Sequence, residues 1–276
     1  MKKYLKLVTV CILVLGLALM VGCGQKATTE AEKPAGEPEK QATTEAPKEV
    51  TTYKVGTDAA YAPFESVDPS NTIVGFDMDM LNAIAAAEGF KVEFVNTAWE
   101  GIIPSLVEKR NDMLISAMTI NEERKKEVAF SDQYYESTNY IAVLADSPIK
   151  SLADLKGKKV SVQQGTTGDF AITKALGKDY NGIKRFKGTP EALLELKNGK
   201  VDAGVADSGV IMEYVKNNTD LNLKIVKDDK FAKEYYGIAI RKDDTELLNK
   251  VNSGLKKIKE NGEYDKVFEK YFGKVK

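Results

Sequence analysis

Polar side chains in this sequence gather directly after segments that read as buried β-strands. Such positions are held by residues 57–61 (TDAAY), 116–119 (SAMT), 163–168 (QQGTTG) and 206–208 (ADS), while Trp99 opens a helical segment. In open α/β sheets, ligands bind beyond the carboxyl ends of the strands, where helix N-termini also point. We therefore expect these residues to line a binding cleft.

The residue types suit a small zwitterion that carries a polar side chain. The guanidinium of Arg124 offers a bidentate fork to a carboxylate, and free backbone amides at the start of the QGTTG helix favour the same anion. Asp207 complements an ammonium group, and Asp58 could take a basic or an amide side chain. Trp99 and Tyr61 could sandwich an aliphatic or guanidinium group between them.

Each of these residues also has a plainer structural interpretation. Arg124 lies in the charged run EERKKE and could be a solvated helix residue. Asp207 precedes a helix and could be its N-cap, and Asp58 could begin a turn at the end of its strand. Trp99 could belong to the core. Spacing alone leaves these alternatives open.

The composition excludes several classes of function. The 276 residues contain no histidine, which excludes a histidine base, a His-containing catalytic triad and a His-ligated zinc site. With 43% hydrophobic and 29% charged residues, the composition is that of a globular protein. A net charge of −1 gives no electrostatic footprint for nucleic acid. We expect no catalytic residue, no cofactor and no metal.

The first 22 residues have the composition of an export signal. The basic string MKKYLK precedes an apolar run that is shorter than the about 20 residues of a membrane-spanning helix. The string Met20-Val21-Gly22-Cys23 resembles the lipobox of bacterial lipoproteins, with methionine where leucine is usual. That resemblance implies that Cys23 is lipidated and becomes the mature N-terminus. The alternatives are an uncleaved anchor or an ordinary cleaved signal.

Residues 23–50 are expected to form the lipidated Cys23 and a disordered tether. The stretch has no aromatic residue, contains three prolines and repeats the string ATTEA. Cys11 would be lost with the signal, so the exported domain would have no free thiol and no disulfide. We expect the protein at the cell membrane, anchored by lipid on its extracytoplasmic face.

From residue 52 onward, strand-like and helix-like segments alternate, which indicates an α/β fold. The order strand-helix-strand-helix-strand occurs twice and predicts two similar halves around a cleft. The expected segments are 53–58, 75–89, 91–95, 100–110 and 112–118 in the first half, 158–164, 167–177, 183–188, 190–199 and 201–207 in the second, and closing helices over 245–260 and 263–271.

Seven strings in order resemble the extracellular solute-binding proteins (family 3) of polar amino acid ABC transporters. The strings are VGTDAAYAPFE, IVGFDMDML, WEGIIPSL, SAMTINEERKKEVAFSD, VSVQQGTTG, VDAGVAD and EYYGIAIRKD, and the resemblance runs from about residue 52 to residue 272. It implies the two-lobed, periplasmic-binding-protein-like (type II) fold, with an interlobe cleft. Lobe 1 would comprise residues 51–133 plus 237–276, and lobe 2 residues 139–231, joined by hinge strands at 134–138 and 232–236.

The resemblance also implies roles for the polar residues that bind the α-groups of the ligand. Arg124 would grip the α-carboxylate of an amino acid, helped by amides and hydroxyls at Ala117, Thr119 and Thr167. Asp207 would bind the α-ammonium group. The two lobes would close around the ligand and present it to a membrane permease.

The remaining positions implied by the resemblance concern the α-ammonium and the side chain of the ligand. Ser116 would assist with the α-ammonium, Asp58, Tyr61 and Trp99 would form the side-chain pocket, and Gln163 matches a variable specificity position. A basic ligand such as arginine or lysine is favoured, with glutamine next. The expected partners are the amino acid, an ABC transporter permease and the membrane, without nucleic acid, and the protein is expected to be a monomer.

Two other functions fit the same fold. A sensory lipoprotein would report ligand occupancy to a membrane receptor. An exported dehydratase-like enzyme would need a general acid or base near neutrality, which without histidine falls to a carboxylate such as Glu100 or to a lysine.

Overall fold

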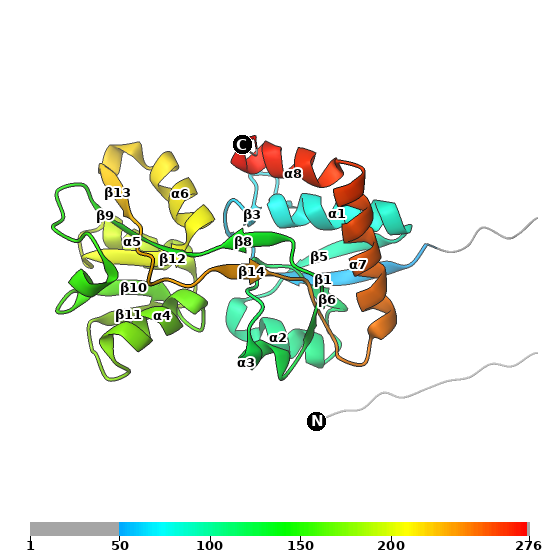
Figure 1. Cartoon of the computed structure of the whole chain (residues 1–276), viewed down its shortest axis with the longest axis horizontal. Coiled ribbons are helices and arrows are strands. Elements are labelled where there is room, and N and C mark those ends of the chain that lie inside the picture. The colour runs from blue at the N-terminus through cyan, green and yellow to red at the C-terminus, as the bar shows by residue number, and fades with distance from the viewer. Residues whose placement is uncertain (1–49, 275–276) are drawn as a thin grey trace, which may run out of the picture. The chain divides into compact units, whose positions relative to one another are not determined.

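The computed structural model describes residues 50–274, which lie in one compact unit. The predicted signal, Cys23 and nearly all of the predicted tether are outside these residues. Two five-stranded sheets dominate the fold, and we call the parts built on them lobe 1 and lobe 2 (Figure 1). In lobe 1 the strand order is β5 (Lys91–Asn96), β1 (Thr52–Thr57), β6 (Met113–Leu114), β15 (Ala239–Ile240) and β7 (Ala129–Phe130).

Lobe 2 repeats this arrangement of strands. Its order is β11 (Ile183–Phe186), β10 (Val160–Gln163), β12 (Ala203–Asp207), β9 (Asn139–Leu144) and β13 (Leu223–Val226). In each lobe the strand that begins the repeat, β1 or β10, pairs in parallel with both of its neighbours. An antiparallel strand, β15 or β9, is then added next to β6 or β12. The predicted internal repeat and the α/β class are thus confirmed.

Helices cover the faces of both sheets (Figure 1). Lobe 1 carries α1 (Phe76–Glu88), α2 (Trp99–Val107), α3 (Glu122–Lys125), α7 (Thr245–Glu260) and α8 (Glu263–Phe272), with a small sheet of β2 (Ala60–Tyr61), β3 (Glu65–Val67) and β4 (Ile73–Val74). Lobe 2 carries α4 (Thr167–Leu176), α5 (Thr189–Lys197) and α6 (Ser208–Asn217), with short 3-10 helices η1 (Leu152–Leu155) and η2 (Thr219–Leu221). Within residues 50–274, no helix is both long and apolar enough to cross a membrane.

The long helices follow from the spacing of their apolar residues. In α7, Leu247, Val251, Leu255 and Ile258 recur every three or four residues and are all buried, which gives one apolar face. In α1 the predicted end at Gly89 is confirmed, because this glycine adopts the left-handed conformation that closes a helix. The predicted closing helices over 245–260 and 263–271 match α7 and α8 to within one residue.

An aspartate at the equivalent position of each half makes the same kind of hydrogen bond. In lobe 1 the Asp112 carboxylate accepts a hydrogen bond of 2.9 Å from the backbone N–H of Lys54. In lobe 2 the Asp202 carboxylate accepts one of 2.7 Å from the backbone N–H of Lys159. Each bond ties the start of the third strand of the repeat to the start of its first.

Two short strands run between the lobes. Strand β8 (Tyr135–Ser137) pairs antiparallel with β14 (Glu234–Tyr236), and these strands fall inside the segments predicted as hinges (Figure 1). Aromatic rings surround the pair: Phe64 contacts Tyr135 and Tyr236 at centroid distances of 5.0 and 5.2 Å. Phe272 of α8 contacts Phe64 at 5.6 Å. The crossover is therefore enclosed in an apolar, tightly packed environment.

The predicted strand over 112–118 is much shorter in the structure. Only Met113–Leu114 pair in the sheet, and the chain then turns away, with Ala117 in the left-handed conformation at a φ of 44°. The backbone N–H of Ala117 donates a hydrogen bond of 2.7 Å to the buried carboxylate of Asp77. This bond offsets the strain of a non-glycine residue at positive φ and turns the segment toward the lobe boundary.

Candidate functional site

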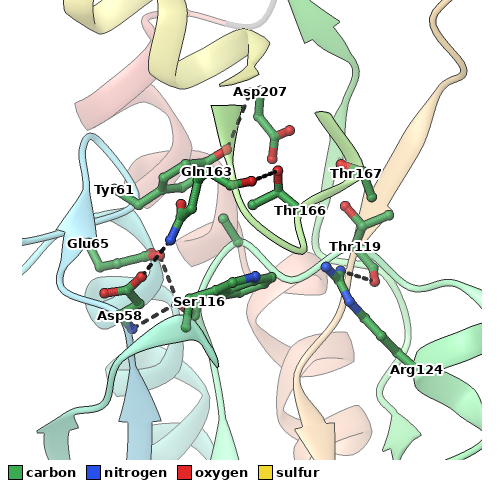
Figure 2. A pocket seen from close by; sticks show the side chains of 12 residues that line it. Asp58, Tyr61, Glu65, Ser116, Thr119, Arg124, Gln163, Thr166, Thr167 and Asp207 are labelled. Atoms are coloured by element: carbon green, nitrogen blue, oxygen red, sulfur yellow. Dashed lines mark hydrogen bonds between the residues drawn. The ribbon is translucent and has the colours of Figure 1, made fainter. Parts of the chain in front are cut away.

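A single pocket at the boundary between the lobes contains every residue predicted for the binding site (Figure 2). The space between its lining atoms, counted together with the solvent at its mouth, is about 310 Å³. The predicted residues that line it are Asp58, Tyr61, Trp99, Ser116, Ala117, Thr119, Arg124, Gln163, Thr167 and Asp207. Thr166, from the segment 163–168 that was expected to border the cleft, also lines it, and so does Glu65, which was not predicted.

The carboxyl ends of four strands position the polar side chains. Asp58 follows β1, Ser116 lies just after β6, Gln163 ends β10 and Asp207 ends β12. The N-terminus of α4 also meets the pocket, and its N-cap Thr166 accepts a hydrogen bond from a backbone N–H in its first turn. The strand-end rule that motivated the prediction therefore explains why residues from both halves converge.

Arg124 is buried, with 7% of its surface exposed. Asn121 caps the short helix α3 and accepts the backbone N–H of Arg124. The guanidinium donates one hydrogen bond of 2.7 Å to the carbonyl oxygen of Thr119, and its carbon lies 5.0 Å from the ring centroid of Trp99. The solvated-helix interpretation is wrong for this residue. Within residues 50–274 its side chain makes no second hydrogen bond, so the guanidinium retains N–H groups for a carboxylate.

Burial lowers the pKa of the Arg124 guanidinium, whereas the nearby charges of Asp207 and Glu234 act in the opposite direction. An arginine remains protonated at any physiological pH. The site therefore contains a fixed positive charge that has lost most of its contact with water. Such a charge favours an anionic group that enters the pocket.

Asp207 supplies a buried carboxylate from lobe 2. It occupies the N-cap position of α6, but its side chain makes no capping bond, so the N-cap interpretation does not explain it. One of its oxygens accepts a hydrogen bond from the hydroxyl of Tyr236. The other, Oδ1, is buried without a hydrogen-bond partner among the described residues. Burial, together with the charge of Glu234, raises the pKa of Asp207 to about 7. A cationic donor is what this carboxylate lacks.

Asp58 lies at the opposite end of the pocket and is linked to lobe 2 by Gln163 (Figure 2). The Gln163 amide nitrogen donates hydrogen bonds of 3.0 Å to Asp58 Oδ2 and to the Lys187 carbonyl oxygen. The Gln163 amide oxygen accepts one of 2.7 Å from the hydroxyl of Thr189. A reversed amide would place its oxygen against two acceptors. Thr189 and the Lys187 carbonyl thus fix the orientation of Gln163.

Glu234 in the crossover strand β14 connects the lobes through hydroxyl groups. Its Oε2 accepts hydrogen bonds of 2.7 Å from Thr119 of lobe 1 and 2.8 Å from Thr167 of lobe 2. Its Oε1 accepts one of 2.8 Å from the Asn139 amide. The two threonine hydroxyls expected to assist Arg124 therefore direct their hydrogens to Glu234 in this structure.

Trp99 combines the core and cleft interpretations that the sequence left open, and Tyr61 also has two roles. Trp99 is half-buried: it packs on the apolar cluster that includes Ile102 and also borders the pocket. The Tyr61 hydroxyl oxygen accepts the backbone N–H of Asp207 at 3.3 Å, so it links the lobes. Both rings are thus partly structural and partly exposed to the pocket.

Three polar residues that hydrogen-bond within the site were not predicted from the sequence, because their positions gave no strong indication of a role. Glu65 lies in the quoted string VGTDAAYAPFE, and Glu234 in EYYGIAIRKD, but neither ends a strand of the repeat. Thr189 begins a helix that the sequence predicted from Pro190. Their importance depends on contacts with residues far away in the chain, which spacing does not reveal.

Residues 53–274 match the bacterial extracellular solute-binding proteins, family 3. The chain belongs to this family. It is similar to a probable histidine-binding protein of Neisseria gonorrhoeae, with 40% identity over 275 residues that cover 99% of this chain and 97% of that protein. Among solved structures it resembles the arginine-, lysine-, histidine-binding protein ArtJ from Geobacillus stearothermophilus, with a TM-score of 0.79, 44% identity, and coverage of 82% of this chain and 97% of that one.

A second similar structure is an ancestral arginine-binding protein bound to glutamine. The TM-score is 0.76 and the identity 47%, over 81% of this chain and 98% of that protein. As a family 3 solute-binding protein, the chain has the predicted two-lobed type II fold. The family also makes it a binding protein rather than an enzyme, as predicted.

Asp207→Asn should make the ligand-free protein more stable above pH 7 but weaken its binding of the amino acid. Since the folded pKa of about 7 exceeds the unfolded 3.8, the native state binds this proton more tightly, and the free energy of unfolding falls as pH rises between these values. The variant should remove this decline and gain about 1 kcal/mol or more above pH 7. Its amino acid affinity should fall at least about tenfold.

The measurements for Asp207→Asn are thermal unfolding at several pH values without ligand and calorimetric titration with ligand. Asp229→Asn is the matched control, because Asp229 is exposed. An Asn variant with unchanged affinity would contradict the role given to Asp207.

Thr189→Val should weaken ligand binding although Thr189 does not line the pocket. Valine has nearly the same shape but cannot donate to Gln163, so the Gln163 amide loses its fixed orientation and its bond to Asp58. A lost neutral hydrogen bond corresponds to about a 2- to 10-fold weaker affinity by calorimetry. Thr219→Val, at an exposed position, is the control. Equal affinities for both variants would count against this positioning role.

Proposed function

We propose that this protein captures an amino acid with a cationic side chain outside the cytoplasm and delivers it to an ABC importer. The observation that carries the proposal is the pair of buried, opposite charges that border one pocket: Arg124 from lobe 1 and Asp207 from lobe 2. A free amino acid has a carboxylate and an ammonium group on adjacent atoms. The guanidinium would bind the carboxylate, and Asp207 Oδ1, which lacks a hydrogen-bond partner among the described residues, would bind the ammonium group.

The other end of the pocket supports a basic ligand. Asp58 and Ser116 present oxygen atoms there, and among the pocket-lining residues Arg124 is the only cation. An acidic side chain would meet no counter-charge at this end, and an aliphatic one would bring no hydrogen-bond donor to these oxygens. Arginine and lysine carry donors of the required charge, and glutamine, which carries an amide donor, comes next.

Relatives support this ligand class. The ArtJ protein is an arginine-, lysine-, histidine-binding protein, and the solved structure of the ancestral arginine-binding protein has glutamine bound. A lysine/arginine/ornithine-binding protein of Escherichia coli is 31% identical over 265 residues, covering 94% of this chain and 96% of that protein. We infer the same ligand class for this chain.

Binding would act by stabilising the closed arrangement of the lobes. The pocket residues belong to both lobes, so a ligand that contacts Arg124 and Asp207 at once binds the closed form more tightly than the open one. That difference in affinity sets how far the ligand shifts the population. The permease would then recognise the closed form.

A thermal-shift screen of the twenty amino acids tests the ligand class. Arginine and lysine should give the largest increases in melting temperature, because stabilisation by a ligand grows with the logarithm of the ratio of its concentration to its dissociation constant. Arg124→Ala should bind the best ligand at least about 100-fold more weakly, since a buried carboxylate would lose two charge-assisted hydrogen bonds. Arg110→Ala, an exposed arginine of the same lobe, is the control. Stabilisation by no amino acid would refute the proposal.

We further propose that the protein is attached to the extracytoplasmic face of the membrane by lipid on Cys23. The support is the sequence Met20-Val21-Gly22-Cys23 after an apolar segment. Cells fed an alkyne analogue of palmitate should label the protein, and Cys23→Ser should abolish the label and move the protein from the membrane to the soluble fraction. Cys11→Ser is the control, and equal labelling of the Cys23 variant would rule out this anchor.

A further inference from the structure

Two buried carboxyl groups lie together next to the binding pocket. Glu65 in β3 is 1% exposed and Asp77 in α1 is 0% exposed, and the backbone N–H of Asp77 donates a hydrogen bond of 3.0 Å to the carbonyl oxygen of Phe64, the residue before Glu65. Glu65 Oε2 and Asp77 Oδ1 are both buried and have no hydrogen-bond partner within residues 50–274. A proton shared between these two carboxyl oxygens would satisfy both of them.

The surroundings of the pair provide no compensating positive charge. Within residues 50–274, neither carboxyl takes part in an ion pair with a lysine or arginine. The titratable groups that face it are all acidic or neutral: Asp58, Tyr61, Tyr134 and Tyr135. Burial raises the pKa of both carboxyls, and the charge of Asp77 raises that of Glu65 further. Two ionised carboxylates would repel each other strongly in this environment.

The other hydrogen bonds fix where the shared proton lies. Asp77 Oδ2 accepts the backbone N–H of Ala117 at 2.7 Å and the hydroxyl of Tyr134 at 2.8 Å. Glu65 Oε1 accepts the hydroxyl of Ser116 at 2.9 Å. Since these oxygens already accept hydrogens, only Glu65 Oε2 and Asp77 Oδ1 are left for a shared proton.

This proton position determines the polarity of a pocket residue. The Ser116 hydroxyl hydrogen points to Glu65, and the Ser116 oxygen accepts the backbone N–H of Asp58 at 3.0 Å. A hydroxyl oxygen has a second lone pair, and Ser116 lines the pocket beside Asp58 (Figure 2). That lone pair is available to a ligand. If the proton lay on Glu65 Oε1 instead, Ser116 would present its hydrogen to the pocket.

We propose that Glu65 and Asp77 share one proton and thereby hold Ser116 as a hydrogen-bond acceptor for a donor group on the ligand side chain. Glu65 acts as a positioning residue through Ser116. This inference rests on the proposed function, because it concerns the end of the pocket that receives the ligand side chain. It assigns Ser116 to that side chain, whereas the family resemblance implied that Ser116 assists with the α-ammonium group.

Infrared spectroscopy at pH 7 tests the shared proton directly. An Asp207→Asn protein, which lacks the other buried carboxyl of the site, should show a protonated-carboxyl C=O band. Adding either Glu65→Gln or Asp77→Asn to it should remove the band, because in each variant the amide N–H replaces the shared proton and the remaining carboxyl is ionised. A band that persists after Glu65→Gln is added would overturn the proposal.

Ligand affinity tests the role of Ser116. Glu65→Gln retains an oxygen for the Ser116 hydroxyl and an N–H for Asp77, so it should bind arginine within about threefold of the wild type. Glu65→Leu leaves the Ser116 hydrogen free to turn into the pocket and should bind about tenfold more weakly. Ser116→Ala should lose a similar factor, and the Glu65→Leu/Ser116→Ala double variant should lose no more than Ser116→Ala alone.

Two results would contradict this role. One is a Glu65→Gln variant as weak as Ser116→Ala, and the other is full additivity of Glu65→Leu and Ser116→Ala. If Glu65→Leu fails to fold by circular dichroism, the comparison of Glu65→Gln with Ser116→Ala and the infrared band decide. A wild-type protein that binds no amino acid would refute the proposed function instead, while the infrared band would still report on the shared proton.

Discussion

The site depends on charges that are buried in the protein before any ligand arrives. Arg124 has lost nearly all contact with water, and the carboxylates that partly offset its charge, Asp207 and Glu234, come from lobe 2 and from the crossover. Burying such groups costs free energy that imperfect pairing within the protein does not recover. A ligand with both charges would complete the pairing, so the same groups that make the site costly also make it selective for a zwitterion.

The hydrogen bonds of the site also join one lobe to the other. Glu234 accepts one hydroxyl from each lobe, Gln163 of lobe 2 donates to Asp58 of lobe 1, and Tyr61 of lobe 1 accepts a backbone N–H of lobe 2. The bonds of Gln163 and Tyr61, and the pair of bonds that Glu234 accepts, require both lobes in this arrangement. The arrangement of the lobes and the geometry of the pocket are therefore one property of the molecule.

Much of this could be predicted from the sequence, for identifiable physical reasons. Parallel strands end at one edge of a sheet, so residues such as Asp58 and Asp207 could be assigned to a cleft from their positions alone, and the family strings identified Arg124 despite its charged neighbours. Apolar spacing predicted α7 closely. Glu65 and Glu234 escaped because their partners are distant: Thr119 and Glu234 are 115 residues apart. The length of β6, which ends at Leu114, was overestimated because the hydrogen bond from Ala117 to Asp77 holds the following residues outside the sheet.

The path of the chain through the two sheets has a consequence for biosynthesis. Every strand of the lobe 2 sheet lies between residues 139 and 226, whereas the lobe 1 sheet needs β15 (Ala239–Ile240) inserted between β6 and β7. As the chain emerges from its N-terminus, lobe 2 has all its strands before lobe 1 does. The sheet of lobe 1, whose first strands are synthesised before any strand of lobe 2, therefore remains incomplete until β15, in the last quarter of the polypeptide, has been made.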